Sequence, residues 1–224
     1  MWLPKDRLEH GFIPRHRHAQ AYAALVLSGR YEEAGDSGRF LASAGDVLCH
    51  RSHEAHQNFI TTSEAVVLNL PVPSEHCLPP AFKIADPDAF LKDKHLDMAT
   101  AFQALNPIEI IRPLDRDWPD QLARELTSDP ALSIQNWAAM NGLAAATVSR
   151  GFRKTFGITP IRFRAEARAR RAVEALLKGN TSLASLACDL DFADQPHMTR
   201  AVRSIVNASP AKWRKVNSIQ EKPE

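Results

Sequence analysis

The sequence predicts an α+β chain of more than one domain, with a small β-barrel at the N-terminus and an all-helical half that contains two helix-turn-helix units. Short apolar and β-branched stretches, separated by turn residues, indicate the barrel. Beyond residue 119 the segments begin and end with residues typical of helix termini. Within that half one stretch of sequence is repeated. Together these three observations predict the fold class.

Composition excludes membrane-spanning classes. Of the 224 residues, 44% are hydrophobic and 24% charged, which suffices for one large domain or two small ones. The longest apolar runs are far shorter than the roughly 20 residues that cross a bilayer, and the N-terminus lacks the apolar core of a secretory signal. Three widely spaced cysteines without a C-x-x-C pair fit a reducing compartment. We therefore expect a cytoplasmic protein with no membrane partner.

Charge divides the chain into two parts. Residues 131–216 hold 14 Lys and Arg against 5 Asp and Glu, a formal charge of +9. Residues 1–130 hold 13 basic and 19 acidic side chains, a formal charge of −6. A compact basic segment beside an acidic one predicts that one part of the chain contacts a polyanion and the other does not.

The barrel is predicted over residues 12–70, and the domain that contains it over 1–75. Turn sequences such as Gly35-Asp36-Ser37-Gly38 separate its strands. Prolines that follow residue 70 end the β region, because proline cannot donate to a sheet ladder. The expected strands are Tyr22–Leu27, Phe40–Leu41, Val47–Cys49, Phe59–Thr62 and Ala65–Leu70.

Residues 76–118 are predicted to be a helical connector and linker. A helix is expected over 86–105, with a patchy apolar face that includes Phe90, Leu96 and Phe102. A helix in this place must bury that face against something. Two alternatives stay open: the face joins two chains in a homodimer, or it packs on the barrel of its own chain.

The helical half is predicted over 119–216, followed by a tail at 217–224. Thr159-Pro160 and Ser209-Pro210 each pair a helix N-cap with a first-turn proline. Left-handed C-caps are expected at Gly142, Gly157, Gly179 and Asn207. The expected helices are 119–128, 133–141, 145–156, 160–178, 183–190, 194–206 and 210–215.

Two copies of a helix-turn-helix pattern lie in this half. When Arg150 is aligned with Arg200, the ten residues after each arginine align without a gap. In the preceding turns Ala138-x3-Gly142-Leu143 matches Ala187-x3-Asp191-Phe192, and the second turn has one extra residue. Each copy is a short helix, a tight turn and a second helix that carries basic residues. Two copies in a segment of charge +9 favour DNA binding over an ordinary helical core.

These residues resemble the DNA-binding domain of the AraC/XylS family of transcription regulators. The resemblance covers about residues 120–215 and is carried by Thr147-Val-Ser-Arg-Gly-Phe-Arg-Lys-Thr-Phe-Gly-Ile-Thr-Pro, Arg168-Ala-Arg-Arg-Ala, Asp191-Phe-Ala-Asp-Gln-Pro-His-Met-Thr-Arg-Ala-Val and Ser209-Pro-Ala-Lys-Trp-Arg. Departures from the family pattern are local: Asp191 and Asn207 stand in place of glycine, and Met198 and Val202 in place of phenylalanine.

The resemblance implies two recognition helices that enter successive major-groove segments of double-stranded DNA, joined by a long helix at 160–178. Arginine suits guanine, because its guanidinium donates to O6 and N7 together. The implied base-reading residues are Ala146, Ser149, Arg150, Gln195, Pro196, Thr199 and Arg200. The implied phosphate contacts are Arg153, Lys154, Thr159, Arg203 and Ser209. A solvated surface arginine remains the alternative for each basic residue.

The N-terminal half resembles, less specifically, a cupin-like sensor domain. Gly11-x4-His16-x-His18 is similar to the first cupin motif, and Gly45-Asp46 with His56 and Asn58 to the second. His16, His18 and His56 are therefore candidate ligands for an effector or a divalent transition metal. The usual cupin glutamate is missing, since its place is taken by Tyr22. Histidines that only form hydrogen bonds, and a separate surface cluster of His50 and His53, are the alternatives.

The function that follows is a sequence-specific transcription regulator that is not an enzyme. A small-molecule or metal effector in the barrel would change how the DNA-binding half is held, and with it the recruitment or exclusion of RNA polymerase at a promoter operator. One alternative is a metal-dependent cupin enzyme fused to a basic helical domain. The other is an architectural protein that coats DNA without sequence preference.

Overall fold

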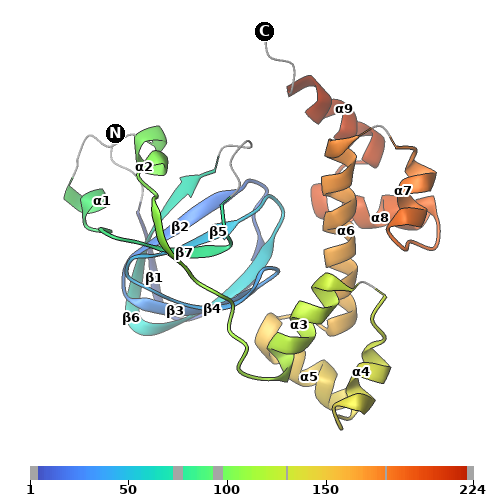
Figure 1. The fold of residues 1–224 in the computed structure, drawn as a ribbon, viewed down its shortest axis with the longest axis horizontal. Coiled ribbons are helices and arrows are strands. Elements are labelled where there is room, and N and C mark those ends of the chain that lie inside the picture. Colours follow the sequence, from blue (N-terminus) through green and yellow to red (C-terminus); the bar gives the residue numbers. More distant parts are fainter. Residues whose placement is uncertain (1–4, 73–77, 93–97, 130, 180, 221–224) are drawn as a thin grey trace. The chain divides into compact units, whose positions relative to one another are not determined.

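The computed structural model describes residues 5–72, 78–92, 98–129, 131–179 and 181–220 (Figure 1). The chain divides into two compact units, Met1–Asp120 and Gln121–Glu224. The first holds an antiparallel sheet and the second is helical. Among the described helices, none has the length and apolarity needed to cross a bilayer.

The first unit is an antiparallel β-sheet that curls into an open barrel (Figure 1). Neighbouring strands follow the order β4-β3-β6-β2-β5-β7-β8, and β1 pairs with β6. The predicted β-structure over residues 12–70 is confirmed, but the strands expected at Phe59–Thr62 and Ala65–Leu70 form one continuous strand, and the strand Arg30–Gly35 was not predicted. The strands are β1 (Lys5–Arg17), β2 (Tyr22–Ser28), β3 (Arg30–Gly35), β4 (Gly38–Ser43), β5 (Asp46–His50), β6 (Ala55–Pro71), β7 (Ala81–Ile84) and β8 (Pro107–Ile110).

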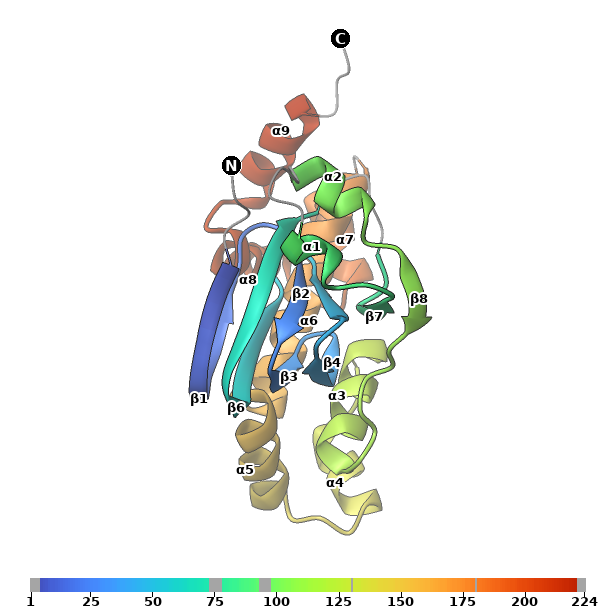
Figure 2. The ribbon, with the colours of Figure 1, turned by 90° about the vertical axis from the view of Figure 1, so that its left-hand side faces the viewer.

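Strand β6 organises this sheet, because it pairs with three other strands. Along one side it runs beside β1, with His16 opposite His56 (Figure 2). On its other side its first half pairs with β3, where Glu33 lies opposite Asn58, and its second half pairs with β2. Residues of one strand that alternate in sequence point to the same face of a sheet. The side chains of His56 and Asn58 therefore share a face with Glu33.

Two apolar layers flank the sheet. One includes Tyr31, Leu48 and Ile60, each almost fully buried. On the other, the short helices α1 (Ala89–Lys92) and α2 (Met98–Gln103) cover the sheet and contribute Phe90 and Phe102 to a core shared with strands β2, β5, β6 and β7. Phe90 and Phe102 therefore pack on the barrel of their own chain rather than forming a free dimer face, and Leu96 lies outside the described residues.

Sheet structure extends beyond the predicted boundary at residue 75. Strand β7 pairs with β5, and β8 pairs with β7, so that part of the predicted helical connector belongs to the sheet. The single helix expected over 86–105 is also wrong in part, because the described residues there form two short helices, α1 and α2. Each added strand has four residues and prolines nearby, and its pairing partner lies far away in the sequence. Local sequence patterns therefore do not predict β7 and β8.

The helices of the second unit lie close to their predicted positions, except that the last one, predicted over 210–215, continues to Gln220 and so includes part of the predicted tail. Helix α6 joins the two helix-turn-helix units and begins and ends at the predicted residues. The hydroxyl oxygens of Thr159 and Ser209 accept hydrogen bonds from the backbone N–H of Arg162 and Lys212, which confirms both predicted N-caps. The helices are α3 (Trp118–Ser128), α4 (Ile134–Met140), α5 (Ala145–Phe156), α6 (Pro160–Lys178), α7 (Leu183–Asp189), α8 (Gln195–Val206) and α9 (Pro210–Gln220).

The two turns have equivalent hydrogen bonds. The N–H of Leu143 donates to the carbonyl of Ala138 at 2.9 Å, and the N–H of Phe192 donates to the carbonyl of Ala187 at 2.9 Å. Asp191, the departure from glycine, takes the left-handed conformation with φ 56°. Aspartate tolerates this region better than most residues do. The predicted repeat is therefore present in the backbone, and Asp191 does not disrupt the second turn.

Three of the four predicted left-handed C-caps are confirmed. Gly142, Gly157 and Asn207 have φ values of 65°, 78° and 52°. Gly179 instead has φ −179°, which is extended backbone, so its predicted left-handed cap is wrong. The chain leaves helix α6 there in an extended conformation rather than in a tight turn.

Candidate nucleic-acid interface and effector site

Helix α5 separates an apolar face from a cationic one. Phe152 and Phe156 are fully buried and stack with ring centroids 4.7 Å apart. Arg150, Arg153 and Lys154 are exposed. Because α5 buries its apolar residues at helical spacing, the arginines and the lysine are held on a surface that neighbouring helices leave open. This is the arrangement that a helix lying in a DNA groove requires.

Helix α8 repeats this separation with other side chains. Met198 and Val202 are fully buried against α6 and α7, and Ile205 is buried beside them. Arg200 and Arg203 are exposed. Val206 is half-buried and packs against the same core. Two cationic faces of the same kind thus come from the two repeats.

Inside the barrel, the predicted effector residues are brought together. The ligand atoms of His16, His18 and His56 lie within 4.8 Å of one another. Nε2 of His56 is 3.0 Å from Nε2 of His16, and the hydroxyl oxygen of Tyr22 is 3.5 Å from the same His56 nitrogen. Nδ1 of His16 contacts the carbonyl oxygen of Pro14 at 2.9 Å, which fixes its ring. The structure therefore supplies a three-imidazole group with a phenol beside it.

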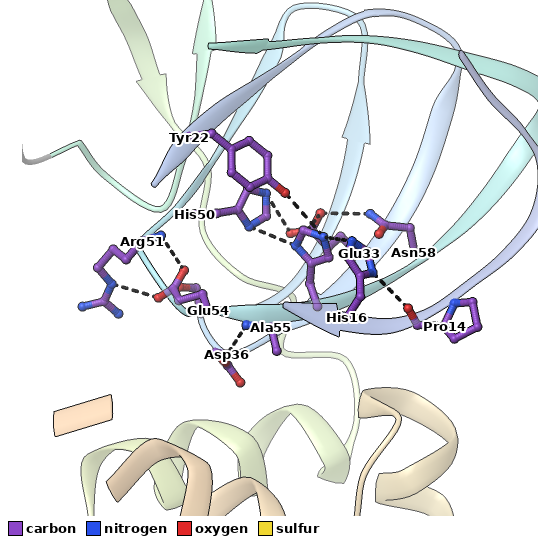
Figure 3. Close-up of polar contacts among 12 residues, drawn as sticks. Pro14, His16, Tyr22, Glu33, Asp36, His50, Arg51, Glu54, Ala55 and Asn58 are labelled. Carbon is purple, nitrogen blue, oxygen red and sulfur yellow. Dashed lines mark hydrogen bonds and ion pairs between the residues drawn. The ribbon is translucent and has the colours of Figure 1, made fainter. Parts of the chain in front are cut away.

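A second group shares His56 with the first. Nδ1 of His56 is 3.0 Å from Nδ1 of His50, and Figure 3 shows His50, Tyr22, His16 and Glu33 converging inside the barrel. The Tyr22 ring stacks on His50 with centroids 4.5 Å apart. Glu33 faces both rings, with Oε1 3.6 Å from His50 Nε2 and Oε2 3.7 Å from His56 Nδ1. Five polar side chains, one from each of the strands β1, β2, β3, β5 and β6, thus form one cluster.

Burial changes the proton affinities of this cluster. Burial raises the pKa of the Glu33 carboxyl to about 8. The hydrogen bond from Asn58 lowers this pKa, but by less than burial raises it. Burial also lowers the pKa of His50 to about 3 and that of His56 still further, and the neighbouring histidines act in the same direction. Near neutral pH the two rings are therefore uncharged, which is the form of imidazole that binds metals.

Charged residues at the start of β6 hold the cluster in place. The Asp36 carboxylate accepts a hydrogen bond from the N–H of Ala55 at 2.7 Å and pairs with Arg15. The Glu54 carboxylate accepts hydrogen bonds from the Arg51 backbone and side chain (Figure 3). These contacts fix the strand end from which His56 projects. A His50–His53 surface cluster is ruled out, since both are buried, with exposed fractions of 7% and 8%.

The sequence and the fold were compared with those of known proteins. Residues 137–216 match a family model described as a helix-turn-helix domain. This match lies within residues 119–216, where the two helix-turn-helix units were predicted. The predicted helix-turn-helix domain is therefore confirmed. No curated protein matches the sequence.

Solved structures similar to the chain include one that covers nearly all of it and others that cover less than half of it. ToxT from Vibrio cholerae strain SCE256, bound to an unsaturated fatty acid, is 10% identical with a TM-score of 0.42, over 94% of this chain and 93% of that one. The DNA-binding domain of AdpA, in complex with a target DNA, is 20% identical with a TM-score of 0.43, over 47% and 96%. A probable AraC family regulator from Rhodopseudomonas palustris CGA009 is 18% identical with a TM-score of 0.40, over 43% and 94%.

Within the helix-turn-helix domain, the predicted DNA contacts lie on helices α5 and α8 and at the starts of α6 and α9. Four of them, Ser149, Thr159, Thr199 and Ser209, are half-buried. The exposed ones are Ala146, Arg150, Arg153, Lys154, Gln195, Pro196, Arg200 and Arg203. The oxygens of Thr159 and Ser209 already accept cap hydrogen bonds, which leaves each hydroxyl proton free to donate. Their positions are consistent with the prediction, and contact with DNA remains a prediction.

Sequence reasoning missed Glu33 and gave His50 the wrong surroundings. Glu33 is one of two adjacent glutamates on β3, and only the pairing of β3 with β6 turns it inward, opposite Asn58. His50 ends β5 opposite Tyr22 of β2. The alternation of Tyr31, Glu33 and Gly35 along one strand was the available signal for Glu33, since Tyr31 belongs to the core.

Proposed function

We propose that this regulator reads a specific operator with helices α5 and α8 and responds to a small-molecule or metal effector bound in its barrel. The observation that carries the first part is the equivalent placement of Arg150 and Arg200. Each is exposed at the same position of its repeat, one residue before the start of the aligned ten-residue stretch. Two side chains that suit guanine at matched positions favour readout of two groove segments.

Base readout and phosphate contact are divided among the predicted residues. We assign base edges to Ala146, Ser149 and Arg150 on α5 and to Gln195, Pro196, Thr199 and Arg200 on α8. We assign phosphates to Arg153, Lys154, Thr159, Arg203 and Ser209. Phosphate contacts fix the position of the protein on the duplex and carry no sequence information of their own.

Retardation of a fragment of the protein's own promoter tests the first part. We expect a retarded complex that survives an excess of random competitor DNA and weakens steeply with salt, because several phosphates are neutralised. If random DNA displaces the fragment as well as specific DNA does, the protein is an architectural one and the proposed sequence readout is wrong. Protection mapping of the same fragment gives the site length and the spacing of its two segments.

The barrel histidines are the proposed contacts of the effector. The ligand atoms of His16, His18 and His56 lie within 4.8 Å of one another, and a few converging polar groups are typical of ligand sites. We expect His16→Ala to abolish the effector response while operator binding changes by no more than a few fold. The reason is that the helical unit has its own core around α6. An equal loss of operator binding without effector would contradict this division.

Partners beyond DNA follow from the same proposal. We infer RNA polymerase as the protein whose access or recruitment changes, and a cytoplasmic location. A homodimer is still proposed, but the face of residues 86–105 is not available for it, because Phe90 and Phe102 are buried in their own unit. Sedimentation of the protein alone and on its operator measures the stoichiometry directly.

A further inference from the structure

The buried carboxylate of Glu33 has no cationic partner to balance its charge. The side chain of Glu33 is 7% exposed, and its one close donor is the Asn58 amide, with Nδ2 2.9 Å from Oε2. Among the described residues, no lysine or arginine pairs with it. Burying an unpaired carboxylate is strongly unfavourable. The group therefore requires either a proton or a cation from solution.

The hydrogen-bond directions of the neighbouring rings lead to the same requirement. A carbonyl oxygen only accepts, so Nδ1 of His16 carries the proton in its contact with Pro14. When the rings are neutral, His56 must then donate from Nε2 to His16, and His50 must donate from Nδ1 to His56. Nε2 of His50 is left with a lone pair, buried and without a hydrogen-bond partner, 3.6 Å from Oε1 of Glu33.

Nε2 of His50 and Oε1 of Glu33, which both carry lone pairs, thus face each other at 3.6 Å. We propose that Glu33, His50 and His56 bind one divalent transition-metal ion inside the barrel. This inference rests on the proposed sensor function, because it names the ligand class of that same barrel. Metal–nitrogen and metal–oxygen bonds of about 2.0–2.2 Å in a tetrahedral site place ligand atoms about 3.3–3.6 Å apart. The Glu33 carboxylate meets this separation, with Oε1 3.6 Å from Nε2 of His50 and Oε2 3.7 Å from Nδ1 of His56, and one ligand atom from each of the three residues lies within 4.8 Å of the other two.

The inner group suits a cation better than the outer group of His16, His18 and His56. Three neutral imidazoles leave the charge of a divalent ion uncompensated in a low-dielectric barrel, whereas Glu33 supplies one negative charge. The ligands of the inner group are also buried, while His16 and His18 are only half-buried. His56 turns Nδ1 toward the inner group and Nε2 toward the outer group. It therefore connects a metal in the inner group to the proposed effector histidines.

Supporting contacts hold the inner ligands in orientation. Asn58 fixes the carboxylate of Glu33, and the stacked ring of Tyr22 fixes His50. Such outer contacts set ligand orientation in metal sites. A small pocket beside the group, with a cavity volume of about 10 Å³, is lined by Glu33, His50 and His56 among others. That volume matches a single water molecule or ion rather than an organic effector.

Cobalt(II) titration of the full-length protein tests the proposal. The protein is purified without an affinity tag and treated with a chelator, and visible absorption reports the coordination of bound cobalt. We expect one cobalt ion per chain, displaced by zinc. Glu33→Gln and His50→Ala should each weaken binding by at least about tenfold. The matched control is Glu32→Gln, the same change on the adjacent residue, whose side chain is 34% exposed and which should bind cobalt like the wild type.

Each other outcome has a definite meaning. If His18→Ala abolishes cobalt binding and Glu33→Gln does not, the ion lies in the outer group and the inner site is wrong. If the wild type binds no cobalt, Glu33 is a protonated acid in a neutral network, and the proposal is overturned. Circular dichroism shows whether Glu33→Gln is folded, and glutamine has the shape of the protonated acid.

Promoter-fragment retardation on the same samples separates this proposal from the proposed function. Cobalt binding through Glu33 and His50 with no retardation of DNA would contradict the operator-reading proposal and leave the metal site standing. Operator binding that is unchanged by cobalt would contradict the sensor role alone. Operator binding with no cobalt bound would overturn the metal site alone.

Discussion

The two helix-turn-helix units have the same backbone but different chemistry at equivalent positions. The first uses glycine in its turn, and stacked phenylalanines in its core. The second uses Asp191 in the turn and Met198 and Val202 in the core, and Asp194 caps its recognition helix with a 2.6 Å hydrogen bond to the N–H of His197. The recognition helix of the first unit begins after Ala144, which has no capping side chain.

The comparison shows what the motif requires. Both turns need one residue in the left-handed region and a small alanine in the preceding helix, because these set the approach of the two helices. The core needs apolar volume, and the cap is optional. Stability is therefore distributed differently in the two units, although the surface that each presents is alike.

The largest difference is expected in the cores. Phe152 and Val202 are aligned and both fully buried. Phe152→Ala should reduce the free energy of unfolding by about 3–5 kcal/mol, because it leaves a cavity beside Phe156 and Phe163. Val202→Ala removes only two methyl groups, which corresponds to about 1.5 kcal/mol. Urea unfolding followed by circular dichroism measures both, and equal losses would show that the two cores are energetically alike.

Base readout is the next largest effect. Arg150→Ala and Arg200→Ala should each lose about 1–3 kcal/mol of discrimination at one operator position, because a bidentate contact to guanine is removed. Arg203→Ala is the matched control, since a phosphate contact weakens binding to all sequences alike. Competition titrations with operator and random DNA measure this. If Arg150→Ala lost the same affinity for both, its base-reading role would be wrong.

The turns are expected to differ by less. Gly142 has φ 65°, and a Cβ built there meets no atom within 4 Å, so Gly142→Ala measures backbone strain alone. We expect a loss of about 1–2 kcal/mol. Asp191→Gly should instead stabilise the second turn by less than about 1 kcal/mol, because it relieves the same strain. Thermal unfolding compares the two, and a destabilised Asp191→Gly variant would show that the aspartate side chain supports the turn.

Helix caps give the smallest expected effect. Asp194→Ala should cost about 1 kcal/mol, because the N–H of His197 loses its acceptor. Ala144→Ser should stabilise the first recognition helix by up to about 1 kcal/mol, since the residue already has the extended conformation of an N-cap, with φ −70° and ψ 141°. Unfolding midpoints of the two variants, compared with that of the wild type, measure the contribution of each cap to stability. No gain from Ala144→Ser would mean that the existing helix start is already satisfied.

The helical unit was predictable because its signals are local. The proline and threonine or serine that begin α6 and α9, and the glycine or asparagine that ends α5 and α8, act within one turn of helix. Gly179 shows the limit of this reasoning. A glycine after a helix is permitted to take the left-handed conformation but is not compelled to, and here it is extended.

The barrel was less predictable, because pairing between strands that are distant in the sequence decides which side chains point into it. His16, His18 and His56 were identifiable from their spacing, and the structure brings them together. Glu33 lies inside only because β3 pairs with β6 in the register that sets it opposite Asn58. A shift of one residue would place Glu32 inside instead. The alternation of Tyr31 with Glu33 is the one local signal that favours the observed register.

The length of helix α6 has a consequence for the DNA. Its 19 residues, at 1.5 Å each, span about 28 Å, and each end belongs to one of the two units. The protein therefore carries a rigid spacer, and in the proposed operator this spacer would fix the interval and the phase of the two sequence elements. Five base pairs inserted between those elements would turn one of them about half a helical turn away from its reader. Such an operator would bind less well than one in which either element alone had been altered, although every recognised base is still present.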